Sequence, residues 1–227
     1  MTLPANIKTL SAVGSDEVGV GDYLAPLVVT SVFVEADQLE ALRQLGVKDS
    51  KSMTDKRICE IAAEIKDLLP HKTLVFENKY YNAMIEKGLN AHVVKSFLHN
   101  KTLGSLTETL PEYPEYIVVD EFVSKQHHLR YLKQLPKKPP IVEKNVFFVK
   151  KGESVHLAVA AASILARAAF VAYMEDFSAK VGIEVLKGAS AKVDRCAGQL
   201  LALLGEDAFK DVCKWHFANT KRVVSDV

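Results

Sequence analysis

The chain turns at Gly14-Ser15-Asp16-Glu17-Val18-Gly19-Val20-Gly21, where an apolar, strand-like segment ends in two adjacent carboxylates. The two glycines after the carboxylates allow the backbone to turn and to approach a ligand closely. Carboxylates at a strand end suit hard, oxygen-loving cations such as Mg²⁺ or Mn²⁺. Bare backbone beside them suits a sugar–phosphate chain, so the segment indicates metal-assisted phosphodiester chemistry. A solvated turn is the alternative interpretation.

Other glycine-loop motifs do not fit this segment. The dinucleotide-binding fingerprint G-x-G-x-x-G needs a glycine at position 24, where the chain has Leu24. A phosphate-binding loop of the G-x-x-x-x-G-K type needs a Gly-Lys dipeptide, which the sequence lacks.

The composition is that of a globular protein with a substantial core. Of 227 residues, 48% are hydrophobic and 25% charged, and 29 basic against 28 acidic residues leave a net charge of +1. The whole molecule therefore does not attract polyanions, and any nucleic-acid binding needs locally segregated charge. We expect one domain over residues 1–227, with a helical C-terminal part from about 178 to 227.

The three cysteines are far apart and form no C-x-x-C pattern, and H-E-x-x-H is also absent, which argues against a structural zinc site. They favour a reduced, cytoplasmic setting. The start of the chain lacks the pattern of a signal peptide. The apolar stretch 157–174 contains Arg167 and many alanines, so we interpret it as a buried helix and expect no membrane partner.

Hydrophobic patterns predict an α/β protein with a mixed central sheet flanked by helices. Strands are expected at 9–18, 26–34, 72–77, 116–120 and 142–149, the first two joined as an antiparallel hairpin. Helices are expected at 55–69 after Thr54, 91–109 after Asn90, 125–135, along 157–174, 191–204 after Ser190, and 207–217.

Acidic residues stand at three strand ends: Asp16-Glu17, Asp120 and Glu153. In an α/β sheet ligands bind where strands end, so these carboxylates are expected to converge. A cluster of four would repel itself, and two divalent cations roughly 3.5–4 Å apart would resolve the repulsion and activate water. Each acid has an ordinary alternative: Asp120 as a turn residue, and Glu153 at the positive N-terminus of the long helix.

Asp16 and Glu17 carry a further condition. Adjacent strand residues point to opposite faces, so we expect the strand to break at this point if both are to share a site.

Taken together, the motifs resemble the type 2 ribonucleases H, the group that contains ribonucleases HII and HIII. The similarity runs along nearly the whole chain in the family's order. Its pieces are Asp16–Gly21 with Pro26–Val28, Lys48–Lys51, Asp120, Lys151–Ser154 with Ala160–Ala166, Lys187–Ser190, and Lys214–Lys221.

Two positions resemble the HIII branch in particular. Ribonuclease HII has an aspartate where this chain has Glu153, and an arginine between its glycines where this chain has Val20. The ending Lys214-Trp215-His216-Phe217-Ala218-Asn219-Thr220 also resembles HIII. Members of that branch usually carry an extra N-terminal substrate-binding domain, and the fifteen residues before Asp16 are too few for one.

The resemblance implies the ribonuclease H-like fold and Mg²⁺- or Mn²⁺-dependent cleavage of the RNA strand in RNA–DNA hybrids, leaving 5′-phosphate and 3′-hydroxyl ends. It maps the catalytic metal ligands onto Asp16, Glu17, Asp120 and Glu153. It places Gly19, Val20 and Gly21 against ribose 2′-hydroxyls, and Ser50 and Lys51 near phosphate.

The physical chemistry of the basic residues agrees with this mapping. Lys48, Lys51, Lys150 and Lys151 could neutralise phosphates, with a solvated basic face as the alternative. We expect a monomeric endoribonuclease acting on RNA–DNA hybrids. Two alternatives remain: an HII-like enzyme that incises at single ribonucleotides embedded in DNA, and a non-catalytic hybrid-binding module.

Overall fold

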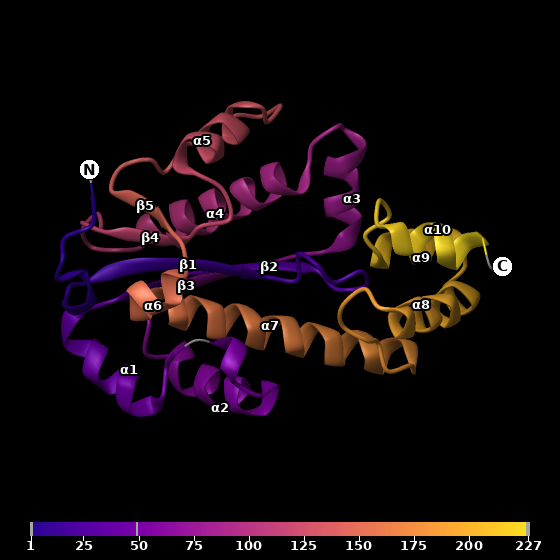
Figure 1. The fold of residues 1–227 in the computed structure, drawn as a ribbon, viewed down its shortest axis with the longest axis horizontal. Coiled ribbons are helices and arrows are strands. Elements are labelled where there is room, and N and C mark those ends of the chain that lie inside the picture. The colour runs from indigo at the N-terminus through magenta and orange to yellow at the C-terminus, as the bar shows by residue number, and fades with distance from the viewer. Residues whose placement is uncertain (1, 49, 226–227) are drawn as a thin grey trace. The chain divides into compact units, whose positions relative to one another are not determined.

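A five-stranded mixed sheet forms the centre of the fold (Figure 1). The computed structural model describes residues 2–48 and 50–225, with the side chains of Lys51 and Ser225 outside that description. The strands are β1 (Ala12–Val18), β2 (Leu27–Val34), β3 (His71–Phe76), β4 (Ile117–Asp120) and β5 (Val146–Val149), in the order β3-β2-β1-β4-β5. β4 runs parallel to both β1 and β5. The α/β prediction is confirmed.

The first two strands are neighbours joined by a short connection, residues 19–26. A parallel pair needs a crossover of a dozen or more residues, so this connection makes β1 and β2 the expected antiparallel hairpin.

Helices cover both faces of the sheet. On one face, a core cluster joins β2 to α1 (Leu39–Leu45), α2 (Asp55–Lys66) and the start of α7 (Leu157–Val181). On the other face, Val13, Ile117 and Val119 pack against α4 (Ala91–Thr107). Because side chains alternate along a strand, Gly14 faces α7, where an added Cβ would lie 2.1 Å from the Ala158 carbonyl carbon. A glycine is therefore required where β1 packs against α7.

Capping explains where α2 begins. Thr54 has extended backbone angles, and its hydroxyl accepts a hydrogen bond from the Arg57 amide at 3.3 Å, as the sequence predicts. The remaining helices are α3 (Asn78–Glu86), α5 (Lys125–Lys133), α6 (Gly152–Val155), α8 (Ala191–Leu204), α9 (Glu206–Val212) and α10 (Ala218–Ser225).

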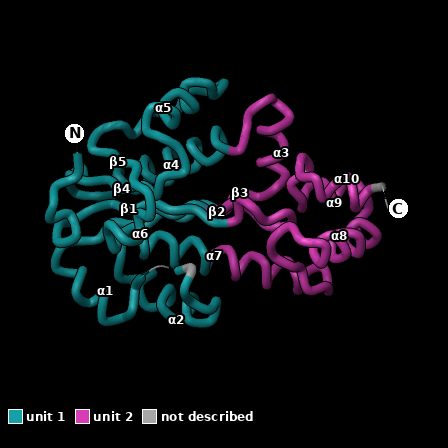
Figure 2. Tube along the Cα trace, in the orientation of Figure 1, with its two compact units in different colours: residues 1–18, 29–74, 92–168 teal, residues 19–28, 75–91, 169–227 magenta. Residues whose placement is uncertain are grey.

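Internal contacts divide the chain into two compact units (Figure 2). The first, teal in the figure, comprises residues 1–18, 29–74 and 92–168, and contains most of the sheet. The second, magenta, comprises residues 19–28, 75–91 and 169–227, and is mostly helical. A single domain over residues 1–227 stays a prediction.

The helix expected at 207–217 is wrong in extent. α9 ends at Val212, and α10 begins at Ala218. Between them the Lys214 amide donates to the Tyr23 carbonyl and the Trp215 amide to the Asn82 side chain. These partners lie far away in sequence, so tertiary hydrogen bonds override the local helical pattern.

The apolar helix α7 is long and apolar enough to cross a membrane, with a mean hydropathy of 1.8 over its most apolar 18 residues. However, 61% of that window is buried inside the protein. This burial agrees with the interpretation of α7 as a core helix.

Candidate active site

The register of β1 and β4 brings two of the predicted acids together. Ser15 pairs with Val119 in the parallel ladder, so the next residues along the two strands, Asp16 and Asp120, reach the same end of the sheet. Both lie on the face covered by α7, since Val13, Ile117 and Val119 point to the opposite face.

A cavity of about 340 Å³ opens at this end of the sheet. Three of the four predicted acids line it: Asp16, Glu17 and Asp120. Among the residues that the structure describes, Val18, Ser50, Ser163 and Arg167 also line it. Among the residues that the structure describes, no group of three or more His, Cys, Asp or Glu side chains is already arranged to hold a metal ion.

Asp16 is buried beside other negative charge. Burial raises the pKa of its carboxyl to about 7, and repulsion by Glu17 and Asp120 acts in the same direction. A hydrogen bond from Ser163 and one from the Glu17 amide, at 2.7 Å, partly oppose the rise. The site therefore contains a carboxyl group that is neutral for much of its population near neutral pH unless positive charge arrives.

Glu17 is held from the other face of the sheet by two residues of α4. Lys95 Nζ lies 3.1 Å from its Oε1, and His99 Nε2 lies 2.9 Å from its Oε2. Burial alone would raise the pKa of Glu17, but the His99 hydrogen bond and the attraction of His99 and Lys95 lower it below its ordinary value.

The strand break expected at Asp16-Glu17 is not present, because β1 continues through Val18. The two side chains keep the usual alternation: Asp16 contacts α7 through Ser163, and Glu17 contacts α4. Both still line one cavity because the sheet ends here and the cavity opens around its end.

A buried hydrogen-bond network supports the Glu17 contact. His99 Nδ1 lies 2.8 Å from Ser15 Oγ, and the hydroxyl of Ser31 reaches both Ser15, at 3.0 Å, and Thr102, at 2.8 Å. The His99 ring also stacks on Phe122, with centroids 4.9 Å apart. Because His99 is fully buried and bonded at both nitrogens, it holds Glu17 Oε2 in a fixed position.

Glu153 does not line the acid cavity. It lies in the first turn of α6 and lines a separate pocket with Lys8, Arg43 and His156. Its neighbour Gly152 connects it to the acids, since the Gly152 amide donates to Asp120 Oδ1 at 2.8 Å. The sequence-based alternative for Glu153, the N-terminus of the long helix, is modified by the structure: α6 is a separate short helix that precedes α7.

The predicted phosphate contacts have different surroundings. Ser50 is buried in the acid cavity, with its hydroxyl 2.8 Å from that of Ser163, and its carbonyl accepts from Arg167 at 2.6 Å. The side chain of Lys51 lies outside the described residues. Lys151 is exposed and has left-handed backbone angles (φ 55°, ψ 50°), which are uncommon for a residue with a Cβ and recur at functional sites.

The glycine motif belongs to the second unit. Gly19 has φ +94°, and an added Cβ would lie 2.0 Å from the Pro26 carbonyl oxygen, so no other residue fits there. Gly21 is exposed, with open space where a Cβ would be. Val20 is half-buried. Gly19 therefore shapes the turn, while Gly21 leaves its backbone accessible to a ligand.

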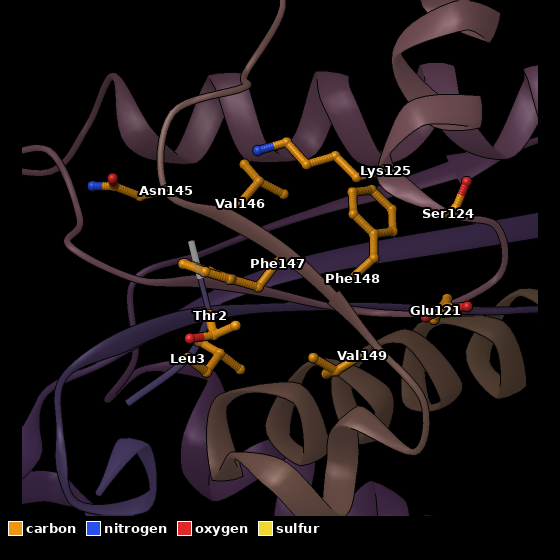
Figure 3. Close-up of a pocket in the computed structure, with 10 residues that line it drawn as sticks. All are labelled: Thr2, Leu3, Glu121, Ser124, Lys125, Asn145, Val146, Phe147, Phe148 and Val149. Atoms are coloured by element: carbon orange, nitrogen blue, oxygen red, sulfur yellow. The ribbon is translucent and has the colours of Figure 1, made fainter. Parts of the chain in front are cut away.

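A larger cavity, of about 530 Å³, lies along β5 (Figure 3). Figure 3 shows the Phe148 ring and the Lys125 side chain at this cavity, together with Leu3 from the start of the chain. None of the predicted site residues lines it, so size alone does not identify the functional site.

Four residues of the site were not identified from the sequence: Lys95, His99, Ser163 and Arg167. Lys95 and His99 are four residues apart, and so are Ser163 and Arg167. This spacing places both members of a pair on one face of a helix. Polar residues four positions apart, and so on one face of a helix, are the signal that could have found them. Arg167 binds Asp55 at 2.8 Å and the Ser50 carbonyl, and so braces the segment that carries Ser50.

Comparison with known proteins gives consistent results. The family model described as Ribonuclease HII matches residues 13–220. Ribonuclease HIII of Bacillus thuringiensis subsp. konkukian (strain 97-27) is 44% identical over 220 residues, covering 96% of this chain and 70% of the relative.

Solved structures show the same similarity. The crystal structure of Bst-RNase HIII in complex with Mn²⁺ superposes with a TM-score of 0.92 at 40% identity, over 97% of this chain and 71% of that one. The ribonuclease H2 from Pyrococcus horikoshii OT3 has a TM-score of 0.75 at 21% identity, over 96% of this chain and 98% of that one. The latter similarity concerns the fold alone.

Proposed function

Since this chain belongs to the ribonuclease HII family and is a ribonuclease H, we propose that it cleaves the RNA strand of RNA–DNA hybrids with the help of divalent metal ions. Cleavage leaves 5′-phosphate and 3′-hydroxyl ends. The observation that carries the proposal is the meeting of Asp16, Glu17 and Asp120 in one cavity at the end of the sheet.

The donor set of the cavity suits the metal. Its three carboxylates are hard oxygen ligands, the kind that Mg²⁺ and Mn²⁺ prefer. Two ions, when bound, supply charge neutralisation and an activated water for in-line displacement of a phosphodiester. The Mn²⁺ complex of Bst-RNase HIII supports the choice of ion.

The chain's own residues have distinct roles in this proposal. Asp16, with a pKa raised by burial and by its acidic neighbours, releases its proton when positive charge enters the cavity. Glu17 is already charged and oriented by Lys95 and His99. Asp120 is oriented by the Gly152 amide, and Glu153 follows next in the chain.

Substrate recognition is assigned to backbone and basic groups. The accessible backbone around Gly21 contacts a ribose 2′-hydroxyl, the group by which a protein distinguishes RNA from DNA. Ser50, Lys51 and Lys151 contact phosphates, which adds affinity independent of base sequence.

The test is cleavage of a labelled RNA–DNA hybrid with and without Mg²⁺ or Mn²⁺. We expect cleavage that requires the metal, and none by Asp120→Asn, which should still fold and bind the hybrid. Glu121→Gln is the matched control, because it removes an adjacent, exposed carboxylate that does not line the acid cavity. Normal cleavage by Asp120→Asn would overturn the proposal.

A further inference from the structure

Lys214 is a fully buried lysine whose ammonium group contacts the loop that carries the glycine motif. Its Nζ donates to the carbonyl oxygens of Asp22 and Ala25, and its own amide donates to the Tyr23 carbonyl at 2.8 Å. One residue of the C-terminal segment thus supplies donors to three carbonyls of residues 22–25. All these groups belong to the second unit.

The surroundings of this ammonium are unusual for a lysine. The aromatic rings of Tyr81 and Phe217 lie 5.8 Å from its nitrogen. Lys214 takes part in none of the ion pairs that the structure describes. Burial lowers the pKa of Lys214 to about 7, against a weaker opposing attraction by Asp22. Burying an amino group is costly unless it is hydrogen-bonded, and the contacts of Nζ with the Asp22 and Ala25 carbonyls offset that cost.

Further bonds fix the same loop from a second side. The Gly188 amide donates to Asp22 Oδ1 at 2.6 Å, and the Tyr23 amide donates to the Gly188 carbonyl at 2.8 Å. The Tyr23 hydroxyl lies 3.0 Å from that of Thr220, and its ring stacks on Phe217 with centroids 6.1 Å apart. The loop directly after Gly21 is therefore held on several sides by the C-terminal segment.

We propose that Lys214 is a positioning residue for substrate recognition, which fixes the backbone of residues 19–25 in the conformation that contacts the RNA strand. This role rests on the proposed function, because the glycine motif is assigned there to the ribose 2′-hydroxyl. A fixed backbone contacts substrate without first losing conformational freedom, so loosening it weakens binding and leaves the chemical step unchanged.

Lys214→Met tests the proposal, because it keeps the apolar stem and removes the donors. Hydrogen exchange of residues 19–25 should become roughly tenfold faster, while exchange in α2 stays unchanged. The KM for a hybrid substrate should rise about tenfold with kcat within about twofold of the parent value, since binding common to ground and transition states is lost. Lys192→Met, an exposed lysine of α8, is the matched control and should change neither quantity.

Tyr23→Phe provides a milder variant in case Lys214→Met does not fold, because it removes one hydroxyl contact and keeps the ring. It should shift exchange and KM in the same direction by a smaller factor. Unchanged exchange of residues 19–25 in the folded Lys214→Met variant would overturn the proposal. If Lys214→Met does not fold, unchanged exchange in Tyr23→Phe would do so. Hydrogen exchange needs no substrate, so it tests the role of Lys214 independently of the proposed activity. Cleavage of the hybrid by the wild-type protein tests the activity itself.

Discussion

Lys95 Nζ lies 3.1 Å from Glu17 Oε1 in a buried ion pair that fixes one of two adjacent carboxylates. The exposed fractions of the two side chains are 9% and 12%. Asp16, the next residue toward the N-terminus, forms no ion pair with any side chain that the structure describes, and its pKa is raised where that of Glu17 is lowered. In many active sites, two neighbouring carboxyl groups have different pKa values because their environments differ, and each then has its own chemical role.

Lys95→Met should lower both stability and activity. It leaves the Glu17 charge buried without its cation, and breaking a buried pair from one side costs about 3 kcal/mol of unfolding free energy. We also expect kcat on a hybrid to fall at least tenfold, since Glu17 loses one of its two orienting contacts. Chemical denaturation and steady-state cleavage measure the two effects.

Two further variants make this prediction specific. Lys101→Met changes an exposed lysine of the same helix and should have little effect on either measurement. Glu17→Gln added to Lys95→Met should recover part of the lost stability, because the unpaired charge is gone. If the double variant were as unstable as the sum of the two single changes, the ion pair would not be the cause.

Asp16→Asn should stabilise the metal-free protein near neutral pH. The folded-state pKa of Asp16 is raised to about 7 from an ordinary 3.8, so its contribution to stability is full below pH 3.8 and is lost as pH rises through 7. Three pKa units correspond to roughly 4 kcal/mol. The advantage of the variant in unfolding free energy should therefore grow from about pH 4 to about pH 7 and then level off.

Metal binding provides the complementary measurement. Mn²⁺ or Mg²⁺ should raise the melting temperature of the wild-type protein at pH 7.5, since a ligand that binds the folded state stabilises it. The same metal ions should raise the melting temperature of Asp16→Asn by a smaller amount. A pH-independent difference between the two metal-free proteins would show that Asp16 is not the titrating group.

The sequence predicted the sheet and three acids of the site because strand ends are local features. The apolar run before Asp120 and the strand-like segment before Asp16 and Glu17 can be recognised without tertiary information. Parallel pairing of these two strands brings their carboxyl ends together. The α4 contacts to Glu17 could not be predicted in the same way. His99 and Lys95 lie about eighty residues away in the chain, and their pairing with Glu17 depends on which helix covers that face.

One error lies where tertiary hydrogen bonds override local preference, and another concerns the end of a strand. The helix break at 213–217 follows from contacts of Lys214 and Trp215 with Tyr23 and Asn82, which no local pattern encodes. The strand continues through Asp16-Glu17 to Val18, and both side chains still line one cavity because that cavity opens around the end of the sheet. Sequence periodicity describes faces correctly but does not describe what lies beyond the end of a strand.

Glu153→Gln should reduce activity less than Asp120→Asn does. Glu153 lies outside the acid cavity and is connected to Asp120 through Gly152, and changes at such outer positions typically cost about 10–100-fold in metal affinity or activity. Raising the Mn²⁺ concentration should restore part of the loss. Glu64→Gln, an exposed carboxylate of α2, is the control. Complete loss at every Mn²⁺ concentration would instead place Glu153 among the direct ligands.

Substrate choice should follow the residue between the two glycines. Val20 cannot make the charged contact that an arginine would offer near the scissile ribonucleotide, so we expect recognition to depend on several consecutive 2′-hydroxyls contacted by backbone. We expect efficient cleavage within RNA tracts of several nucleotides and poor cleavage at a single ribonucleotide embedded in DNA. Two duplexes of equal length, compared at matched salt and Mg²⁺, measure this as a ratio of kcat/KM.

Val20→Arg extends the comparison to the residue itself. Val20 is half-buried beside the exposed Gly21, so an arginine at this position can extend toward solvent and a bound duplex. The variant should gain activity on the single ribonucleotide relative to the RNA tract, because the added charge favours a contact that does not require neighbouring 2′-hydroxyls. Equal kcat/KM on the two duplexes for the wild-type protein would contradict the assignment of substrate choice to this motif. Val20→Arg should then be nearly neutral, because the discrimination would depend on other residues.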